Sequence, residues 1–455
     1  MEAHPRRPHL TTQPHPNPAD PTRAPRRRYG GGVYVEHLSL TDFRCYASAE
    51  VGLAPGVTVF VGQNGQGKTN LVEAVEFLST LSSHRVSSDA PLVRAGTEQA
   101  IARARVRAGR DDTRTLTLEL EINPGKSNRA RINRTPQPRV RDLVGVLRTV
   151  LFSPEDLAIV KGDPSDRRKF IDTVVQTRWP RMAGVKSDYD RVLRQRNALL
   201  KQAAGKHGGG RPDEQDSLEF TLEVFDEQLS QFGAELLLAR LDTLAELLPH
   251  ATGAYAEIAP TNNTISAHYT ATFDISDTEE GTSPSREELA ARMRGALRDR
   301  RRDELARGVS LIGPHRDEIQ LGIGDLPAKG YASHGESWSL ALALRLGSFE
   351  LVRSDGTQPV LILDDVFAEL DATRRERLAE AILPAEQVLI TAAVAEDVPA
   401  RLTGRRFRVA ERQVTLESEL STDPDQQLWT SDVQSEDEPH TAEQPPVDDQ
   451  TEAPA

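Results

Sequence analysis

The segment that most limits the fold of this chain is a glycine-rich loop, Gly62-Gln63-Asn64-Gly65-Gln66-Gly67-Lys68-Thr69. It follows a short apolar run at 57–61 that is typical of a buried strand, and a helical pattern begins at Asn70. In this order the glycines let backbone N–H groups curl around phosphate oxygens, and the helix N-terminus adds its positive dipole end. We therefore expect the loop and Asn70 to bind ATP, with Lys68 at the β and γ phosphates and the Thr69 hydroxyl on Mg²⁺. The alternative is a glycine-rich turn with an incidental lysine.

A second motif supplies the acidic groups that such a loop needs. The apolar run Val360-Leu361-Ile362-Leu363 ends in Asp364-Asp365. An Asp at the end of a buried strand can hold a Mg²⁺-bound water, so we expect Asp364 beside Thr69 as the second metal residue. Asp365 is then placed to orient or deprotonate the attacking water. Paired acids at a strand end also occur as helix caps, which is the alternative.

Ser333-His334-Gly335-Glu336 lies directly before a helical stretch at 337–346, and it resembles the signature sequence of ABC-type ATPases. The resemblance implies a second anion site, in which Ser333, Gly335 and Glu336 meet the γ phosphate held by a partner subunit. Ser333 is thus a candidate catalytic residue, together with Asp365 and Lys68. The loop at 368–371 matches the one after the metal-binding strand in the same superfamily and adds Asp371 to the nucleotide-binding candidates. Ordinary helix capping by Ser333 is the alternative.

Hydrophobic periodicity places these motifs in a split fold. Strands are expected over 33–60, and clean alternation at 101–107 and 116–122 predicts an antiparallel flap. Helical periodicity begins near 165, with a coiled-coil seam and an antiparallel partner near Tyr189 and Val192, joined by a turn at 201–211. The seam residues are Leu218, Leu222, Phe225, Leu229, Phe232 and Leu236. Ordinary helix packing explains such a seam more often than a partner site does.

The predicted fold is α/β: a P-loop ABC-type ATPase head with an antiparallel β flap and an inserted α-helical arm domain. Its expected parts follow in chain order. They are a disordered basic Pro-rich extension at 1–30, the N-terminal part of the head at 31–164, the helical arm at 165–307, the C-terminal part of the head at 308–418 and a disordered acidic tail at 419–455.

Charge is unevenly distributed along the chain. The formal net charge is −13, yet residues 1–30 carry six Arg against two acids, while 421–455 carry ten acids and no Lys or Arg. Residues 94–148 hold thirteen Lys and Arg against six acids, so a basic DNA-binding surface is possible on an acidic protein. The candidate residues are Arg103, Arg105, Arg107, Arg129, Arg131 and Arg134. A solvated charged face is the alternative.

The composition excludes several classes of protein. No apolar run approaches the length that crosses a bilayer, and the first thirty residues lack the apolar segment of a secretory signal. Cys45 is the only cysteine, so no internal disulfide can form. These features predict a cytoplasmic protein without a membrane partner.

Several motifs together resemble the RecF family of bacterial recombination mediators. They are Leu40-Thr41-Asp42-Phe43-Arg44-Cys45-Tyr46, Phe152-Ser153-Pro154-Glu155-Asp156-Leu157, Lys161-Gly162-Asp163-Pro164-Ser165-Asp166-Arg167-Arg168, Gly313-Pro314-His315-Arg316-Asp317 and Leu363-Asp364-Asp365-Val366. The resemblance implies a homodimer that forms on ATP, weak DNA-stimulated ATP hydrolysis, and association with the nucleoid when bound to DNA. It also implies binding to single-strand and duplex DNA or their junction during gap repair and replication restart, with RecO and RecR as partners in loading recombinase. Arg44 is expected to approach the nucleotide phosphates.

The resemblance leaves some positions open. Cys45 stands where Asn is expected, Glu336 where Gln is commoner, and Thr391 where many ABC enzymes place a switch His. The 313–317 motif fits either a turn in which Asp317 pairs with Arg316 or a direct ligand role. Arg167 and Arg168 fit either a solvated charged face or a DNA or partner contact.

Two competing functions remain from the sequence alone. One is the ATP-binding subunit of a membrane transporter, in which the phosphate loop and signature are usually about a hundred residues apart. Lys68 and Ser333 are 265 positions apart, which counts against it. The other is the head of a long-armed SMC-like chromosome protein, whose arms would need far more residues than the stretch from 166 to 307 provides.

Overall fold

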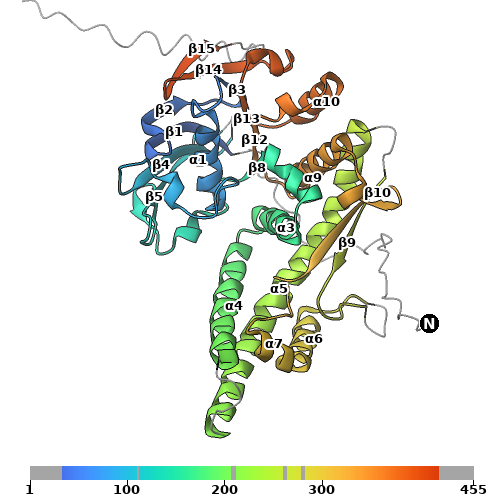
Figure 1. The fold of residues 1–455 in the computed structure, drawn as a ribbon. Coiled ribbons are helices and arrows are strands. Elements are labelled where there is room, and N and C mark those ends of the chain that lie inside the picture. Colours follow the sequence, from blue (N-terminus) through green and yellow to red (C-terminus); the bar gives the residue numbers. More distant parts are fainter. Residues whose placement is uncertain (1–32, 110–111, 206–211, 260–263, 278–281, 420–455) are drawn as a thin grey trace, which may run out of the picture.

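The computed structural model describes residues 33–109, 112–205, 212–259, 264–277 and 282–419. The predicted disordered segment at 1–30, the predicted tail at 419–455 apart from Glu419, and most of the predicted turn at 201–211 lie outside these residues. Figure 1 shows a head built around two large sheets, from which a pair of long helices projects.

The centre of the head is a six-stranded sheet in the order β15-β14-β3-β13-β12-β8. Its strands are β3 (Gly56–Val61), β8 (Thr149–Phe152), β12 (Val360–Asp364), β13 (Gln387–Ala392), β14 (Gly404–Ala410) and β15 (Gln413–Glu419). All neighbours are parallel except β14 and β15. Every residue of β8, β12 and β13 is buried, because a parallel sheet is covered on both faces. This arrangement confirms the predicted α/β class and brings the ends of β3 and β12 to one edge.

The flap is a second, antiparallel sheet in the order β2-β1-β4-β5-β6-β7. It contains β1 (Tyr34–Phe43), β2 (Tyr46–Gly52), β4 (Ala100–Arg107), β5 (Thr115–Ile122), β6 (Arg129–Ile132) and β7 (Thr135–Pro136). Ala102, Ala104 and Leu118 face the core, as their alternation predicts. Helix α1 (Lys68–Thr80) packs in the same hydrophobic cluster as the flap and the parallel sheet, which explains why ten of its residues are buried.

The middle of the chain is mainly helical. It contains α2 (Leu157–Lys161), α3 (Pro164–Arg178), α4 (Met182–Gly205), α5 (Pro212–Ile258), α6 (Arg286–Asp299) and α7 (Arg301–Arg307). Leu222, Leu229 and Leu236 of α5 are buried, and Tyr189 and Val192 of α4 share a core cluster with the last two, so α4 packs along the side of α5 that carries these residues. We call α4 and the portion of α5 beside it the arm (Figure 1).

The arm is continuous with the head at its base. The C-terminal part of α5 packs on α9 (His334–Ser354), the helix that follows the signature sequence. A third sheet joins β9 (Ile265–Thr270) to β10 (Glu318–Ile323) and β11 (Leu326–Pro327). This sheet was not predicted, and it pairs a strand from the expected arm segment with one from the expected head segment.

The remaining elements are short. They are α8 (Ala328–Tyr331), α10 (Ala372–Ile382) and the 3₁₀ turns η1 (Ala90–Leu92), η2 (Val140–Leu143), η3 (Pro154–Asp156), η4 (Phe367–Glu369) and η5 (Ala395–Asp397). Within the described residues, no helix combines the length and the apolar character needed to span a bilayer.

Candidate nucleotide-binding site

The glycine-rich loop connects β3 to α1, as predicted, and two of its glycines cannot be replaced without a clash. Gly67 caps α1 with φ 110°, and a Cβ there would lie 2.7 Å from the Cys45 sulfur and 2.8 Å from the Tyr46 hydroxyl oxygen. A Cβ on Gly62 would lie 2.1 Å from the carbonyl oxygen of Val409. The loop is therefore held tightly against its neighbours, with its backbone at the N-terminus of α1.

Polar side chains of the loop hold its shape. Lys68 is buried, and its ammonium group donates to the carbonyl oxygen of Gln63 and to Asn64 Oδ1, both at the long distance of 3.4 Å. Gln66 Oε1 accepts from the backbone N–H of Glu411 at 2.8 Å. The lysine thus lies across the loop in weak contacts that a phosphate group could replace.

Asp364 meets Thr69 where the parallel strands end. The Thr69 hydroxyl donates to Asp364 Oδ1 at 2.9 Å, and the Thr391 hydroxyl donates to the same oxygen at 2.6 Å. Burial alone would raise the pKa of Asp364, but the nearby His84 ring and hydrogen bonds from the two threonines hold it below its usual value. Thr391, at the position where a switch His was considered, therefore orients the predicted metal carboxylate.

The carboxylate of Asp365 is placed so that one of its oxygens can bind a ligand or a water molecule. Its backbone lies in the left-handed region, with φ 52°, and its N–H donates to Thr391 Oγ1 at 2.9 Å. Its Oδ1 atom is buried and has no hydrogen-bond partner within the described part of the chain. Burial raises the pKa of Asp365, although the nearby charge of Lys68 opposes that shift. An unpartnered carboxylate oxygen with a raised pKa suits a proton acceptor.

Sequence reasoning missed His84 and Glu76, which complete this site. The ring Nδ1 of His84 lies 2.6 Å from Glu76 Oε2, and its Nε2 lies 3.6 Å from Asp364 Oδ2. Burial would lower the pKa of His84, but the two neighbouring carboxylates, Asp364 and Glu76, raise it to about 10. The available signal was the polar run 82–85 directly after α1, which no periodicity rule assigns to a site.

Arg44 has a buried partner on α1. Its guanidinium donates to both carboxylate oxygens of Glu73 and, at 2.9 Å, to the carbonyl oxygen of Pro91. Ser83 donates to the same carboxylate at 2.5 Å. The approach of Arg44 to the nucleotide phosphates stays a prediction, because its charge is already paired here.

The signature residues form a separate group with Asp371. Ser333 is exposed and caps α9, accepting from the Glu336 N–H at 3.2 Å while Glu336 Oε2 accepts from the Ser333 N–H at 2.9 Å. Gly335 lies against the Arg374 guanidinium, which also pairs with Asp371 at 3.0 Å. The capping alternative is thus observed, and it leaves Ser333 and the N-terminus of α9 at the surface.

Residues 313–317 belong to the base of the arm. Asp317 accepts from the Tyr269 hydroxyl and the Thr272 N–H, both at 2.9 Å, whereas Arg316 donates to the carbonyl oxygen of Ser310. The expected pairing of Asp317 with Arg316 is therefore wrong. Burial raises the pKa of Asp317 to about 6. This motif serves the packing of β9, β10 and the arm.

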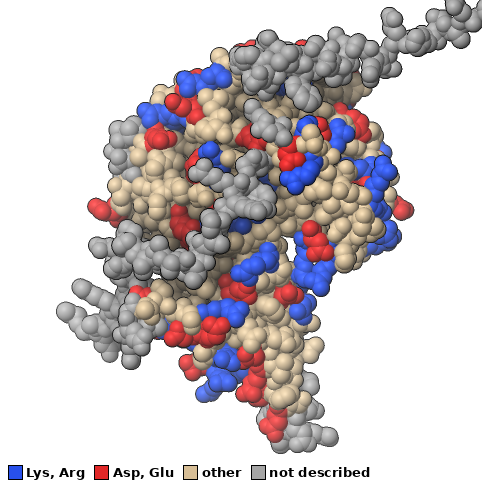
Figure 2. Space-filling model, turned by 180° about the vertical axis from the view of Figure 1, so that it is seen from behind, with Lys and Arg blue, Asp and Glu red and all other residues tan. Residues whose placement is uncertain are grey.

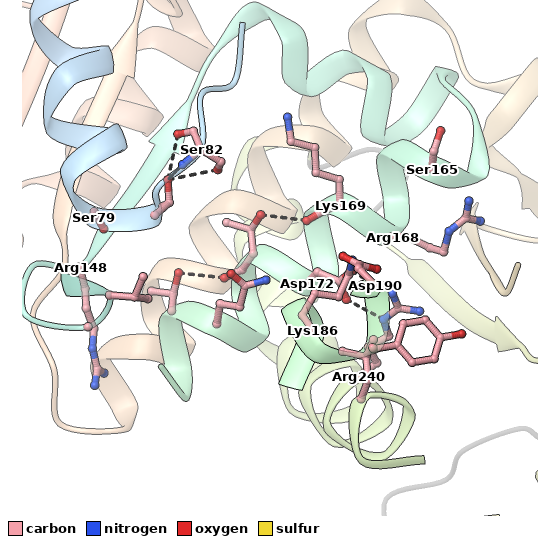
Figure 3. Close-up of a pocket in the computed structure, with 18 of the residues that line it drawn as sticks. Ser79, Ser82, Arg148, Ser165, Arg168, Lys169, Asp172, Lys186, Asp190 and Arg240 are labelled. Atoms are coloured by element: carbon pink, nitrogen blue, oxygen red, sulfur yellow. Dashed lines mark hydrogen bonds and ion pairs between the residues drawn. The ribbon is translucent and has the colours of Figure 1, made fainter. Parts of the chain in front are cut away.

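The paired arginines at the start of α3 have different environments. Arg167 is 5% exposed and forms a two-point ion pair with Glu318, at 2.8 and 2.9 Å, so the solvated-face alternative is wrong for it. Arg168 donates to the carbonyl oxygen of Asp317 at 2.7 Å and lines a cavity of about 360 Å³ between α1, α3 and the arm (Figure 3). Figure 3 shows that the basic groups labelled around this cavity point in different directions.

The flap arginines lie on the outer face of the sheet, as predicted, but carboxylates accompany them. Arg103 and Arg131 both pair with Glu119, and Arg105 pairs with Glu36 at 2.7 Å. On the face of the molecule in Figure 2, basic and acidic side chains are likewise interspersed. The flap is therefore less basic than its arginine count indicates.

Comparison with known proteins places this geometry in a family. The model of the RecF/RecN/SMC N terminal domain matches residues 34–411. A DNA replication and repair protein RecF from Cutibacterium acnes is 61% identical over 389 residues, which cover 84% of this chain and 98% of that protein. The RecF of Streptomyces avermitilis is 58% identical over 84% of this chain and 99% of its own length.

The chain belongs to the RecF family. A solved structure of the recombination mediator protein RecF, described as RecF-ATP in the RecFOR pathway, superposes with a TM-score of 0.73 at 28% identity and covers 87% of this chain and 100% of that one. These findings confirm the resemblance read from the sequence and place the chain among DNA replication and repair proteins. They favour that prediction over a transporter subunit.

Proposed function

We propose that this chain is an ATP-dependent DNA-binding protein of recombinational gap repair and replication restart, which dimerises on ATP and acts with RecO and RecR to load recombinase. The observation that carries the proposal is the separation of the two halves of the site. The loop, Asp364 and Asp365 meet at the edge of the parallel sheet, whereas Ser333 lies exposed at the N-terminus of α9. A second copy of the chain would complete the site.

The residues present fit ATP and Mg²⁺. Among the residues that the structure describes, Lys68 makes only long hydrogen bonds and Asp365 keeps a buried oxygen without a hydrogen-bond partner, while Thr69 and Asp364 lie together. Within the described residues, no group of three or more His, Cys, Asp or Glu side chains could hold a metal alone. That suits Mg²⁺, which usually binds one or two protein groups together with nucleotide phosphates and waters. Bound Mg²⁺ would neutralise charge on the β and γ phosphates.

The protein groups then have distinct tasks in slow hydrolysis. Lys68 and the loop N–H groups hold the phosphates, and the Asp365 carboxylate accepts a proton from the attacking water. Ser333 of a second copy would contribute its hydroxyl and the N-terminus of α9 to the γ phosphate. Hydrolysis would remove the group that joins the two copies, so the dimer would release DNA.

Dimerisation through shared sites can be tested by complementation. We expect Lys68→Ala to lose ATP binding, and Ser333→Arg to bind ATP as a monomer, so that neither variant dimerises alone in light scattering. Mixing the two variants should restore ATP-dependent dimers, because one of the two composite sites then combines an intact loop with an intact signature. Nucleotide affinity of Lys68→Ala equal to wild type would contradict the loop assignment. Dimers formed by Ser333→Arg alone would contradict the signature assignment.

A further inference from the structure

His84 is a buried imidazole held between α1 and β12. Its side chain is 8% exposed, and Glu76 contacts it twice: Oε2 lies 2.6 Å from Nδ1 and accepts the His84 backbone N–H at 3.2 Å. On the other side of the ring, Nε2 lies 3.6 Å from Asp364 Oδ2. The ring therefore has a tight partner on α1 and a looser one on the strand that carries the predicted metal carboxylate.

Helix α1 supports groups that face both oxygens of Asp364. Thr69, in the first turn of α1, contacts Oδ1, and Glu76, seven positions later on the same helical face, holds the ring that faces Oδ2. The 3.6 Å gap between Nε2 and Oδ2 exceeds a hydrogen bond, and Nε2 has no hydrogen-bond partner in the described part of the chain. A small rotation of the carboxylate would close the gap, so His84 can set the direction of Asp364 without blocking its contact with Thr69.

We propose that His84 is a positioning residue for the magnesium site: Glu76 holds the His84 ring, and the ring orients the Asp364 carboxylate. This inference rests on the proposed function, because it concerns the metal that ATP binding would bring. Residues behind the direct metal ligands orient them, and their loss commonly lowers metal affinity by about 10–100-fold. His84 occupies such a place relative to Asp364.

The test measures metal dependence rather than turnover. Binding of a fluorescent ATP analogue is titrated with Mg²⁺ for wild type, His84→Ala and His84→Gln. We expect His84→Ala to need at least about tenfold more Mg²⁺ for half-saturation, while its nucleotide affinity in EDTA stays within about twofold of wild type. His84→Gln should shift less, because its amide can donate one hydrogen bond to either carboxylate.

A matched control is available on the flap. The Nε2 of His37 lies 3.3 Å from Glu50 Oε2, so this histidine also faces a carboxylate, but it is far more exposed and belongs to β1. His37→Ala should leave the Mg²⁺ titration unchanged. Melting temperatures of all variants are compared in EDTA, because a merely structural role would lower stability and nucleotide affinity with and without Mg²⁺.

Two outcomes overturn the inference: half-saturation by Mg²⁺ within about twofold of wild type in His84→Ala, or an equal loss of nucleotide affinity in EDTA. Failure of the proposed function gives a different result, since wild type itself would then show no Mg²⁺-dependent nucleotide binding. The wild-type titration therefore separates the two failures.

Discussion

Arg240 is the charged group whose removal should most disturb the base of the arm. Its side chain is 1% exposed, and its guanidinium pairs with both oxygens of Asp172, at 2.7 and 2.9 Å. The remaining nitrogen donates to the Tyr269 hydroxyl at 3.0 Å and to the carbonyl oxygen of Pro314 at 2.7 Å. One side chain thus joins α5 to α3, β9 and the 313–317 turn.

The expected loss follows from what Arg240→Met leaves behind. Asp172 remains as a buried carboxylate without its cation, and breaking a buried pair in this way typically costs about 3–5 kcal/mol. The Tyr269 and Pro314 oxygens lose a donor as well, at about 1–3 kcal/mol for each unsatisfied group, but these terms overlap with the first. We expect a total loss of about 3–5 kcal/mol in the free energy of unfolding.

A double variant tests the cause. Arg240→Met with Asp172→Leu removes both charges, and because apolar pairs can replace buried ion pairs at little cost, it should recover most of the loss. Urea unfolding followed by circular dichroism measures both variants. Arg191→Met is the control, because that arginine is half exposed and, within the described residues, pairs with Asp188 alone, at 3.4 Å. Its loss should change stability by less than about 0.5 kcal/mol. A double variant no more stable than the single one would refute this reasoning.

Three further predictions concern Asp365, His315 and the flap arginines. Asp365→Asn should keep ATP-dependent dimers but hydrolyse ATP at least about tenfold more slowly, because the amide cannot accept the proton; turnover within about twofold of wild type would place the base elsewhere. Burial lowers the pKa of His315 to about 4, so between about pH 4 and 6.5 the unfolded chain binds a proton that the native chain does not. This group makes stability rise with pH across that window by at most about 3 kcal/mol, and His315→Gln should remove that rise; parallel stability curves for the two proteins would contradict it. Reversing Arg129, Arg131 and Arg134 to Glu should flatten the salt dependence of DNA affinity, which changes by about −0.9 in log–log slope for each neutralised phosphate, without altering dimerisation; an unchanged slope would move the DNA surface to the arm.

The nucleotide site was predictable wherever the chemistry is local in sequence. The glycines of the loop indicate its conformation directly, since the positive φ of Gly67 and the side chains of Cys45 and Tyr46 packed against it leave no room for a Cβ. The strand that ends in Asp364 is equally local, because its run of four apolar residues at 360–363 is typical of a buried strand in a parallel sheet. Once both motifs are placed on parallel strands, the meeting of Thr69 with Asp364 follows from the common edge at which such strands end.

Contacts that depend on how the chain runs between helices and strands could not be predicted from local sequence patterns. His84 reaches Asp364 only because Glu73 and Glu76, two acids on the buried face of α1, hold the segment 83–85 against the helix. Acidic residues in a helical pattern are normally predicted to be exposed to solvent, so the sequence does not predict that Glu73 and Glu76 are buried. The pairing of β9 with β10 was also not predicted, because both strands are short and about fifty residues separate them in the sequence.

The count of basic residues overstates the positive charge that the flap offers to DNA. Alternation correctly placed the arginines of β4 on one face, but the sheet register sets Glu119 of β5 directly between Arg103 of β4 and Arg131 of β6. The local excess of basic residues is therefore partly compensated by neighbours that no single strand reveals. Exposed ion pairs contribute only about 0–1 kcal/mol, so a phosphate could displace a carboxylate from these arginines at small cost. Compensation thus does not remove the flap as a candidate DNA surface. In the proposed function, a compensated flap would bind DNA weakly in one copy and more tightly through the doubled contacts of a dimer.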